Sequence, residues 1–202
     1  MHLRFMNASP LTIALHGRQI LLASKSPRRQ QLLRDLGLPI RIVERDVEES
    51  FPENLQREEI PMFLSKKKAD AFLSDLKENE ILITADTVVW HIDRVYNKPE
   101  DRTEALSMLH ALQSSTHTVY TGVTITSKDK QITFSDATEV TFRSLDMAEI
   151  EYYVDQFMPY DKAGAYGAQD WIGLVAVTHL VGSYFNVMGL PVHLLYGALK
   201  DF

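Results

Sequence analysis

Hydrophobic positions along the chain fall into two alternating patterns, short apolar runs and longer stretches in which apolar residues recur every three or four positions. The short runs are typical of buried strands. Two of them flank Lys128-Asp129-Lys130, which predicts a long hairpin. We expect strands at residues 20–23, 40–43, 81–90, 95–96, 117–126, 131–142 and 171–177.

Capping residues delimit the helical stretches. Ser26 precedes Pro27 as an N-cap does, and Asp101 and Asp146 each have a glutamate three residues later, as in a capping box. We expect helices at residues 27–36, 61–76, 101–112, 146–157 and 191–199. Strands that alternate with helices, plus one long hairpin, predict an α/β fold with a mixed sheet.

Composition narrows the class of protein. The chain has 202 residues, of which 45% are hydrophobic and 24% charged, as expected for a globular protein of one domain or two small lobes. It has no cysteine, which excludes thiolate catalysis and cysteine-ligated zinc and fits a reducing cytoplasm.

The net charge of −6 argues against a nucleic-acid polymer as partner, because such binding depends on neutralising many phosphates. A phosphate-bearing ligand would instead be held in a small local site. No apolar run approaches the ~20 residues that span a bilayer, and residues 1–18 lack the features of a signal peptide. We therefore expect a cytoplasmic protein without a membrane partner.

The start of the first long helix is a candidate phosphate site. Ser24 and Lys25 precede the cap, and Arg28 and Arg29 lie in the first helical turn, where the helix dipole disfavours cations. An anion held by backbone N–H groups, Ser24 and the guanidiniums would explain this arrangement. The alternative is a surface arginine pair after a Ser-Pro cap.

Asp86 interrupts an otherwise apolar strand, where a carboxylate is costly unless it is paired or ligand-bound. Either it is functional, or the strand ends at Ala85 and Asp86 opens a loop. Lys68 flanks the apolar stripe of its helix, so its ammonium either reaches water or meets a ligand. Pro99 restricts Lys98 to an extended backbone.

The loop after the second strand carries four carboxylates, and Mg²⁺ is bound in proteins by carboxylates together with substrate phosphates. The alternative is a solvated acidic loop. Glycine-punctuated stretches at 161–169 and 182–191 are candidate functional loops. The histidines show no metal-ligand spacing, and no Ser-His-Asp arrangement is evident. The loop carboxylates are Glu44, Asp46, Glu48 and Glu49.

Six short segments, taken together and in order, resemble the Maf family of nucleoside triphosphate pyrophosphatases. The resemblance runs from about Ile20 to the C-terminus, and it implies a single domain over 19–202 behind an extension of residues 1–18. It also implies an elongated mixed sheet flanked by helices, with two lobes around a cleft, as in inosine triphosphatases. The segments are 23–29, 68–69, 85–89, 98–99, 161–167 and 182–191.

The resemblance implies hydrolysis of a nucleoside triphosphate at the α–β phosphoanhydride, with house-cleaning of modified nucleotides as the cellular role. It further implies a divalent cation, Mg²⁺ or else Mn²⁺ or Co²⁺, and a homodimer. Asp86 corresponds to the catalytic carboxylate, as base or metal ligand, and Glu49 to a second metal-site carboxylate. The residues that correspond to the triphosphate clamp are Arg29, Lys68 and Lys98, with Ser24 beside them.

Three positions that carry specificity in the family read Arg28, Thr87 and Gln169, as in the branch acting on dTTP and UTP. Gln169 can both donate and accept, as the O4 and N3–H edge of uracil or thymine requires. The branch acting on 7-methyl-GTP has Trp, Gln and Glu there. Three alternatives remain. They are a 7-methyl-GTP pyrophosphatase, a purine triphosphate pyrophosphatase, and a nucleotide-binding regulator of cell division with little turnover.

Overall fold

The structure, a computed structural model, describes residues 9–202. Its helices and strands are α1 (Pro10–Ala14), β1 (Gln19–Leu22), α2 (Pro27–Asp35), β2 (Ile40–Ile42), α3 (Glu59–Asp70), η1 (Leu73–Asp75), β3 (Glu80–His91), β4 (Arg94–Tyr96), α4 (Arg102–Leu112), β5 (Thr116–Thr126), β6 (Gln131–Phe142), α5 (Met147–Phe157), η2 (Ala163–Ala165), α6 (Trp171–Ala176), β7 (Val177–Val181), α7 (Tyr184–Val187) and α8 (Val192–Lys200).

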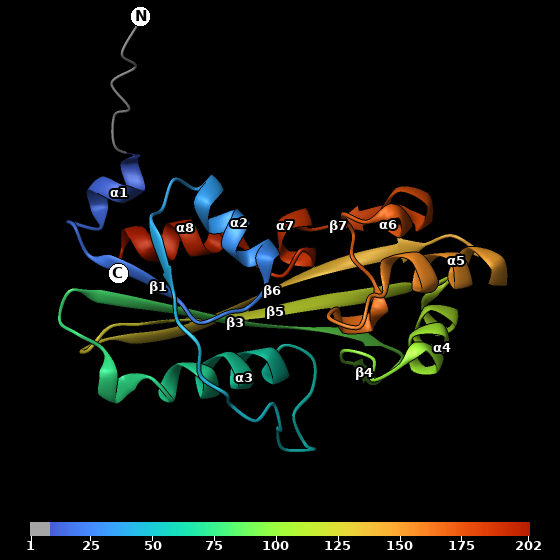
Figure 1. The fold of residues 1–202 in the computed structure, drawn as a ribbon, viewed down its shortest axis with the longest axis horizontal. Helices are drawn as coiled ribbons and strands as arrows, with labels where there is room; N and C mark the ends of the chain where they lie inside the picture. The colour runs from blue at the N-terminus through green and yellow to red at the C-terminus, as the bar shows by residue number, and fades with distance from the viewer. Residues whose placement is uncertain (1–8) are drawn as a thin grey trace, which may run out of the picture.

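One mixed sheet runs the length of the molecule (Figure 1) in the order β2-β1-β3-β5-β6-β7, with β4 paired to β3. β1 pairs in parallel with β2 and β3, and all other pairs are antiparallel. The long strands β3, β5 and β6 extend from one end of the molecule to the other. The predicted α/β class with an elongated mixed sheet is therefore confirmed.

The helices form three groups around this sheet (Figure 1). α3 lies on one face, α2, α7 and α8 lie on the other, and α4, α5 and α6 gather at the far end. The two largest of the four buried clusters in residues 9–202 lie at opposite ends of the sheet. One contains Leu33, Ile83 and Leu195, and the other contains Leu109 and Tyr153. The sheet thus joins two lobes, as the family resemblance implies.

α3 can lie directly on the sheet because β5 has a glycine beneath it. A Cβ atom at Gly122 would overlap the backbone of Pro61, so any side chain there would push the helix away. This close approach matters for the site, since Gly122 is the β5 partner of Asp86. Helix α3, which carries Lys68, is thereby held close to the strand that carries the carboxylate.

The prediction of a strand at 171–177 is wrong. Residues Trp171–Ala176 form helix α6, and the strand β7 begins only at Val177. Ile172 and Ala176, four positions apart, are buried as one helical face, and Gly173 packs against the backbone of Ala168. A short apolar run fits a buried strand and a buried helical turn equally well, so periodicity could not separate them.

Smaller differences concern element ends. The helix expected at 61–76 begins at Glu59, ends at Asp70 and is followed by the short 3₁₀ turn η1. Asp146 and Glu149 form a full capping box. At Asp101, however, only half of it forms, because the Glu104 side chain accepts from the N–H of Glu100 instead.

The segment 1–18, expected to be an extension, lies partly outside the described residues, which begin at residue 9. Leu11 of α1 and Leu15, which caps its C-terminal end, are buried in the core shared with α8. Across residues 9–202, no helix combines the length and apolarity that crossing a bilayer requires.

Candidate active site

A cavity of about 460 Å³ opens where the sheet, α2, α3 and the two glycine-punctuated loops meet. Residues far apart in the sequence share its wall, and they include every site residue expected from the sequence. These are Ser24, Arg28, Arg29, Glu49, Lys68, Asp86, Thr87, Lys98 and Gln169.

The turn before α2 is held by its own side chains. Ser24 Oγ accepts the N–H of Ser26 at 3.2 Å, and Ser26 Oγ caps the helix by accepting the N–H of Arg29 at 3.4 Å. Lys25 is 71% exposed and only loosely paired with Glu44 and Asp46. Its ammonium is therefore free to swing toward an anion at the cavity mouth.

Arg29 is anchored on three sides by protein acceptors. Nε donates to the Gly189 carbonyl at 2.8 Å, Nη1 to the Ala85 carbonyl at 2.9 Å, and Nη2 to Thr87 Oγ1 at 3.0 Å. Burial lowers the pKa of its guanidinium. Ala85 and Thr87 immediately flank Asp86, so Arg29 fixes the strand on both sides of the carboxylate.

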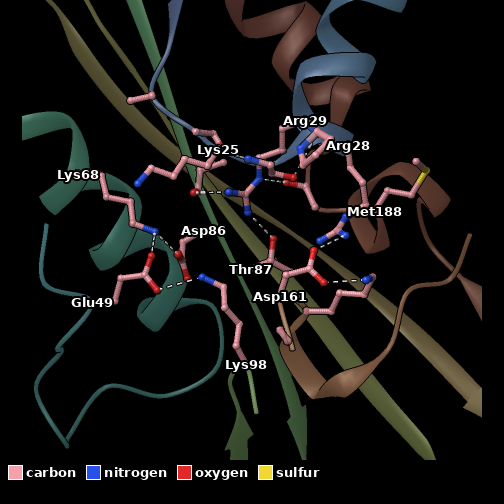
Figure 2. Close-up of a pocket in the computed structure, with 18 of the residues that line it drawn as sticks. Lys25, Arg28, Arg29, Glu49, Lys68, Asp86, Thr87, Lys98, Asp161 and Met188 are labelled. Carbon is pink, nitrogen blue, oxygen red and sulfur yellow. Dashed lines mark hydrogen bonds and ion pairs between the residues drawn. The ribbon is translucent and has the colours of Figure 1, made fainter. Parts of the chain in front are cut away.

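Asp86 lies inside β3, which continues to His91, so the alternative that the strand ends at Ala85 is wrong. Its side chain is 10% exposed, and Lys68 Nζ reaches it from α3 at 2.5 Å. The same ammonium contacts Glu49 Oε1 at 2.7 Å, while Lys98 Nζ contacts Glu49 Oε2 at 3.2 Å (Figure 2). We call Glu49, Lys68, Asp86 and Lys98 the charged cluster.

The charged cluster keeps Glu49 ionised. Burial alone would raise the pKa of Glu49, but the ammoniums of Lys68 and Lys98 outweigh it and lower the pKa to about 2. Two carboxylates thus face two ammoniums inside one cavity, and each lysine can exchange a carboxylate oxygen for a phosphate oxygen.

The donor set fits a divalent cation that is shared with a phosphate ligand. Glu49 and Asp86 are brought within reach of a single ammonium, that of Lys68. Among residues 9–202, no group of three or more His, Asp or Glu side chains is placed to hold a metal ion unaided. Mg²⁺ commonly binds through one or two carboxylates, with substrate phosphates and water completing its shell.

A chain of ion pairs links the two sides of the cavity, and three of its members, Asp161, Lys162 and Asp170, received no site role from the sequence. Asp161 Oδ2 pairs with Arg28 at 3.2 Å, and Asp161 Oδ1 pairs with Lys162 at 2.7 Å. Lys162 Nζ also lies 3.7 Å from Asp170. Two signals in the sequence pointed to Asp161 and Lys162, the glycine-punctuated loop at 161–169 and the segment 161–167 of the family resemblance, and neither indicated a role for them.

The rest of the cavity wall is mostly apolar, with a few polar groups among the apolar side chains. Val89, Val119 and Tyr166 line it, and the Tyr166 hydroxyl bonds His117 Nε2 at 2.8 Å. Gln169 joins them from the loop before α6. An apolar wall with few fixed polar groups is typical of a pocket that orients a flat organic ligand.

Comparisons with known proteins agree with this geometry. Curated relatives named dTTP/UTP pyrophosphatase include one from Christiangramia forsetii, 49% identical over 93% of this chain and 95% of its own. Another, from Parabacteroides distasonis, is 48% identical over 91% and 96%. A third, from Porphyromonas gingivalis, is 47% identical over 91% and 94%.

The solved structure of the Staphylococcus aureus Ham1 protein covers 91% of this chain and 99% of its own, at 14% identity. The TM-score between the two structures is 0.45. The sequence profile described as Maf-like protein matches residues 19–202. With that match and relatives near 48% identity over nearly its whole length, this chain belongs to the Maf family.

Proposed function

We propose that the protein is a nucleoside triphosphate pyrophosphatase that hydrolyses dTTP and UTP to the monophosphate and pyrophosphate. The observation that supports this most strongly is the shared cavity, where lysines and carboxylates face the same space as Gln169 and an apolar wall. A triphosphate needs the first set of groups and a pyrimidine base the second. The names of the relatives point to the same substrates.

In the proposed reaction, Asp86 acts as the base. Lys68 donates to Oδ1, which leaves Oδ2 to take a proton from the attacking water. The water oxygen bonds to the α-phosphorus as the bond from that phosphorus to the α–β bridging oxygen breaks, and pyrophosphate leaves with the bonding electrons. A divalent cation held by Glu49 and Asp86 would neutralise phosphate charge and polarise the phosphoryl oxygens.

The cations place the substrate and stabilise the leaving group. Lys68 and Lys98 are the groups best placed to bind the phosphates, and Lys25 can close on them from the cavity mouth. Arg29 contributes by holding the backbone around Asp86. Phosphoryl transfer depends mainly on such positioning and charge stabilisation.

The direct test is pyrophosphate release from a panel of triphosphates with Mg²⁺, Mn²⁺ or Co²⁺. We expect fast release from dTTP and UTP and slow release from 7-methyl-GTP and ATP. Preference for 7-methyl-GTP or a purine would favour the alternative branch. Tight binding of UTP without release would favour a nucleotide-binding regulator of cell division.

Three further properties belong to this proposal. A homodimer and a house-cleaning role against modified pyrimidine nucleotides rest on the family resemblance, and a cytoplasmic location rests on the composition of the chain. Sedimentation of the purified protein tests the dimer. The triphosphate panel, extended to modified pyrimidines, tests the role.

A further inference from the structure

Gln169 is held in one orientation by its neighbour in sequence. Its Nε2 donates to Asp170 Oδ1 at 3.0 Å. A carboxylate can only accept, so it must face the NH₂ of the amide and never its oxygen. Asp170 therefore decides which end of the Gln169 amide remains for a ligand.

The amide oxygen that remains is buried and unpaired. Within residues 9–202, Gln169 Oε1 has no hydrogen-bond partner, although the residue lines the cavity. A buried acceptor without a partner is uncommon in folded proteins and calls for an explanation. Because the residue lines the cavity, a small movement of its side chain on ligand binding would let a ligand donor supply the missing bond.

Asp170 is itself fixed from the other side. Tyr153 donates its hydroxyl hydrogen to Asp170 Oδ2 at 2.9 Å, and the hydroxyl oxygen accepts the N–H of Gly167 at 3.1 Å. A backbone N–H can only donate, so the single hydroxyl hydrogen is committed to Asp170. Lys162, 3.7 Å from Oδ2, also favours an oxygen there.

The side chains of Gln169 and Asp170 have no room to shift toward the backbone of the loop at Gly167. A Cβ atom at Gly167 would lie 2.6 Å from both Gln169 Nε2 and Asp170 Oδ2. The two side chains therefore occupy the space that any other residue at 167 would fill. We call Tyr153, Gly167, Gln169 and Asp170 the amide cluster.

We propose that Asp170 is a positioning residue for base recognition, which fixes Gln169 with Oε1 toward the cavity so that the site selects a pyrimidine carrying N3–H. This rests on the proposed function and deepens it. Uracil and thymine present N3–H as a donor, which Oε1 accepts. Cytosine presents N3 as an acceptor, which would face Oε1 without a hydrogen between them.

The substitution Asp170→Asn tests this sharply. Tyr153 still donates to the side-chain oxygen, so the new NH₂ faces Gln169 and turns the amide around. Nε2 then faces the cavity and matches cytosine. We expect the ratio of kcat/KM for UTP to that for CTP to fall roughly 10- to 100-fold. A folded variant whose ratio stays within about twofold of the unchanged protein would overturn the proposal.

The double substitution Tyr153→Phe with Asp170→Asn should partly restore the ratio, because the asparagine can then turn its oxygen toward Gln169. Tyr153→Phe alone should keep the preference for UTP, since the carboxylate still faces the amide. The matched control is Asp155→Asn. Asp155 accepts two bonds from Arg102, at 2.6 and 3.0 Å, and does not line the cavity. In the Asp155→Asn variant, the ratio of kcat/KM for UTP to that for CTP should not change.

A measurement on the unchanged protein covers the case in which Asp170→Asn fails to fold. UTP methylated at N3 lacks the donor, so its kcat/KM should fall at least about tenfold below that of UTP. Equal use of the two nucleotides would overturn the proposal. Failure of the proposed function is distinguishable, because the protein would then release no pyrophosphate from UTP at all.

Discussion

The charged cluster and the amide cluster line the same cavity but are built on different principles. In the charged cluster, Lys68 and Asp86 are 16% and 10% exposed, but the long side chains of Glu49 and Lys98 are 46% and 54% exposed. In the amide cluster, Asp170 is 17% exposed and Tyr153 is fully buried. Glu49 and Lys98 can therefore rearrange around a ligand, whereas the amide cluster presents one fixed pattern of donors and acceptors.

This difference suggests a division of work between rate and selectivity. A triphosphate is bound by charge, which acts over distance and tolerates small movements. A base edge is recognised by directional hydrogen bonds, which weaken steeply when misaligned. Changes in the charged cluster should therefore lower turnover for every nucleotide alike. Changes in the amide cluster should alter which nucleotide is preferred.

The largest effect is expected from Asp86→Asn, which keeps the shape but removes the base. Turnover of dTTP and UTP should fall by about 10³-fold or more, because a general base typically contributes 10²- to 10⁴-fold. Pyrophosphate release measures it, and thermal unfolding shows whether the variant folds. A rate near that of the unchanged protein would mean that another group takes the proton.

Lys68→Met should have the next largest effect. It removes the ammonium between Glu49 and Asp86, so kcat/KM should fall about 100-fold for UTP and CTP alike. Lys66→Met is the matched control, since Lys66 pairs with Asp70 on the exposed side of α3. The division of work between the two clusters would be wrong if both variants lost the same activity. It would also be wrong if Lys68→Met changed the ratio of kcat/KM for UTP to that for CTP.

A third prediction concerns pH and the core beside the amide cluster. Burial, with a small contribution from His91, lowers the pKa of His117 to about 3. In the unfolded chain the His117 imidazole is protonated near pH 6.5, whereas in the folded protein it stays neutral until about pH 3. The contribution of the neutral imidazole to the free energy of unfolding is therefore complete above pH 6.5 and declines as pH falls toward 3. Between pH 7 and 5 the loss should be about 2 kcal/mol.

Urea unfolding of the unchanged protein and of His117→Gln at both pH values isolates this contribution, and the variant should lose most of the slope. Glu49 behaves differently. Its lowered pKa, about 2, contributes stability that is complete above pH 4.5 and is lost only as pH falls toward 2. An identical slope in both proteins between pH 7 and 5 would contradict the assignment to His117.

The smallest effect is expected from Asp161→Asn, which breaks the ion pairs with Arg28 and Lys162 at the cavity mouth. Asp161 is 58% exposed, so the free energy of unfolding should change by less than about 1 kcal/mol. KM for UTP should change a fewfold with kcat unaltered. A large loss of kcat would show that this link is part of the charged cluster.

Part of the site could be predicted because some of its residues conflict with a local rule. Asp86 of the charged cluster stands in an apolar strand, and Arg28 and Arg29 of the same cavity stand at a helix start. Lys68 borders an apolar stripe, whereas Glu49 and Lys98 were indicated only by the family resemblance. Such conflicts between local preference and position are visible in a single sequence. What they could not show is that Lys68 bridges Glu49 and Asp86, which depends on how α3 lies over Gly122.

The amide cluster could not be predicted in the same way. Tyr153 reads as an ordinary apolar position of α5, and Asp170 reads as a residue before the next element. Their contact joins α5 to the segment before α6, where the expectation of a strand at 171–177 was wrong. Only the packing of the far lobe brings them together, and nothing local in the sequence specifies that packing.

A crystal structure with UTP that carries an imido group between the α- and β-phosphates would decide whether one cavity holds both halves of the nucleotide. We expect the phosphates to contact Lys68 and Lys98 beside Asp86, and N3 of the base to lie within hydrogen-bond distance of Gln169 Oε1. Phosphates bound away from the charged cluster, or a base whose N3 faces another residue, would contradict this division of the cavity between charge and base recognition.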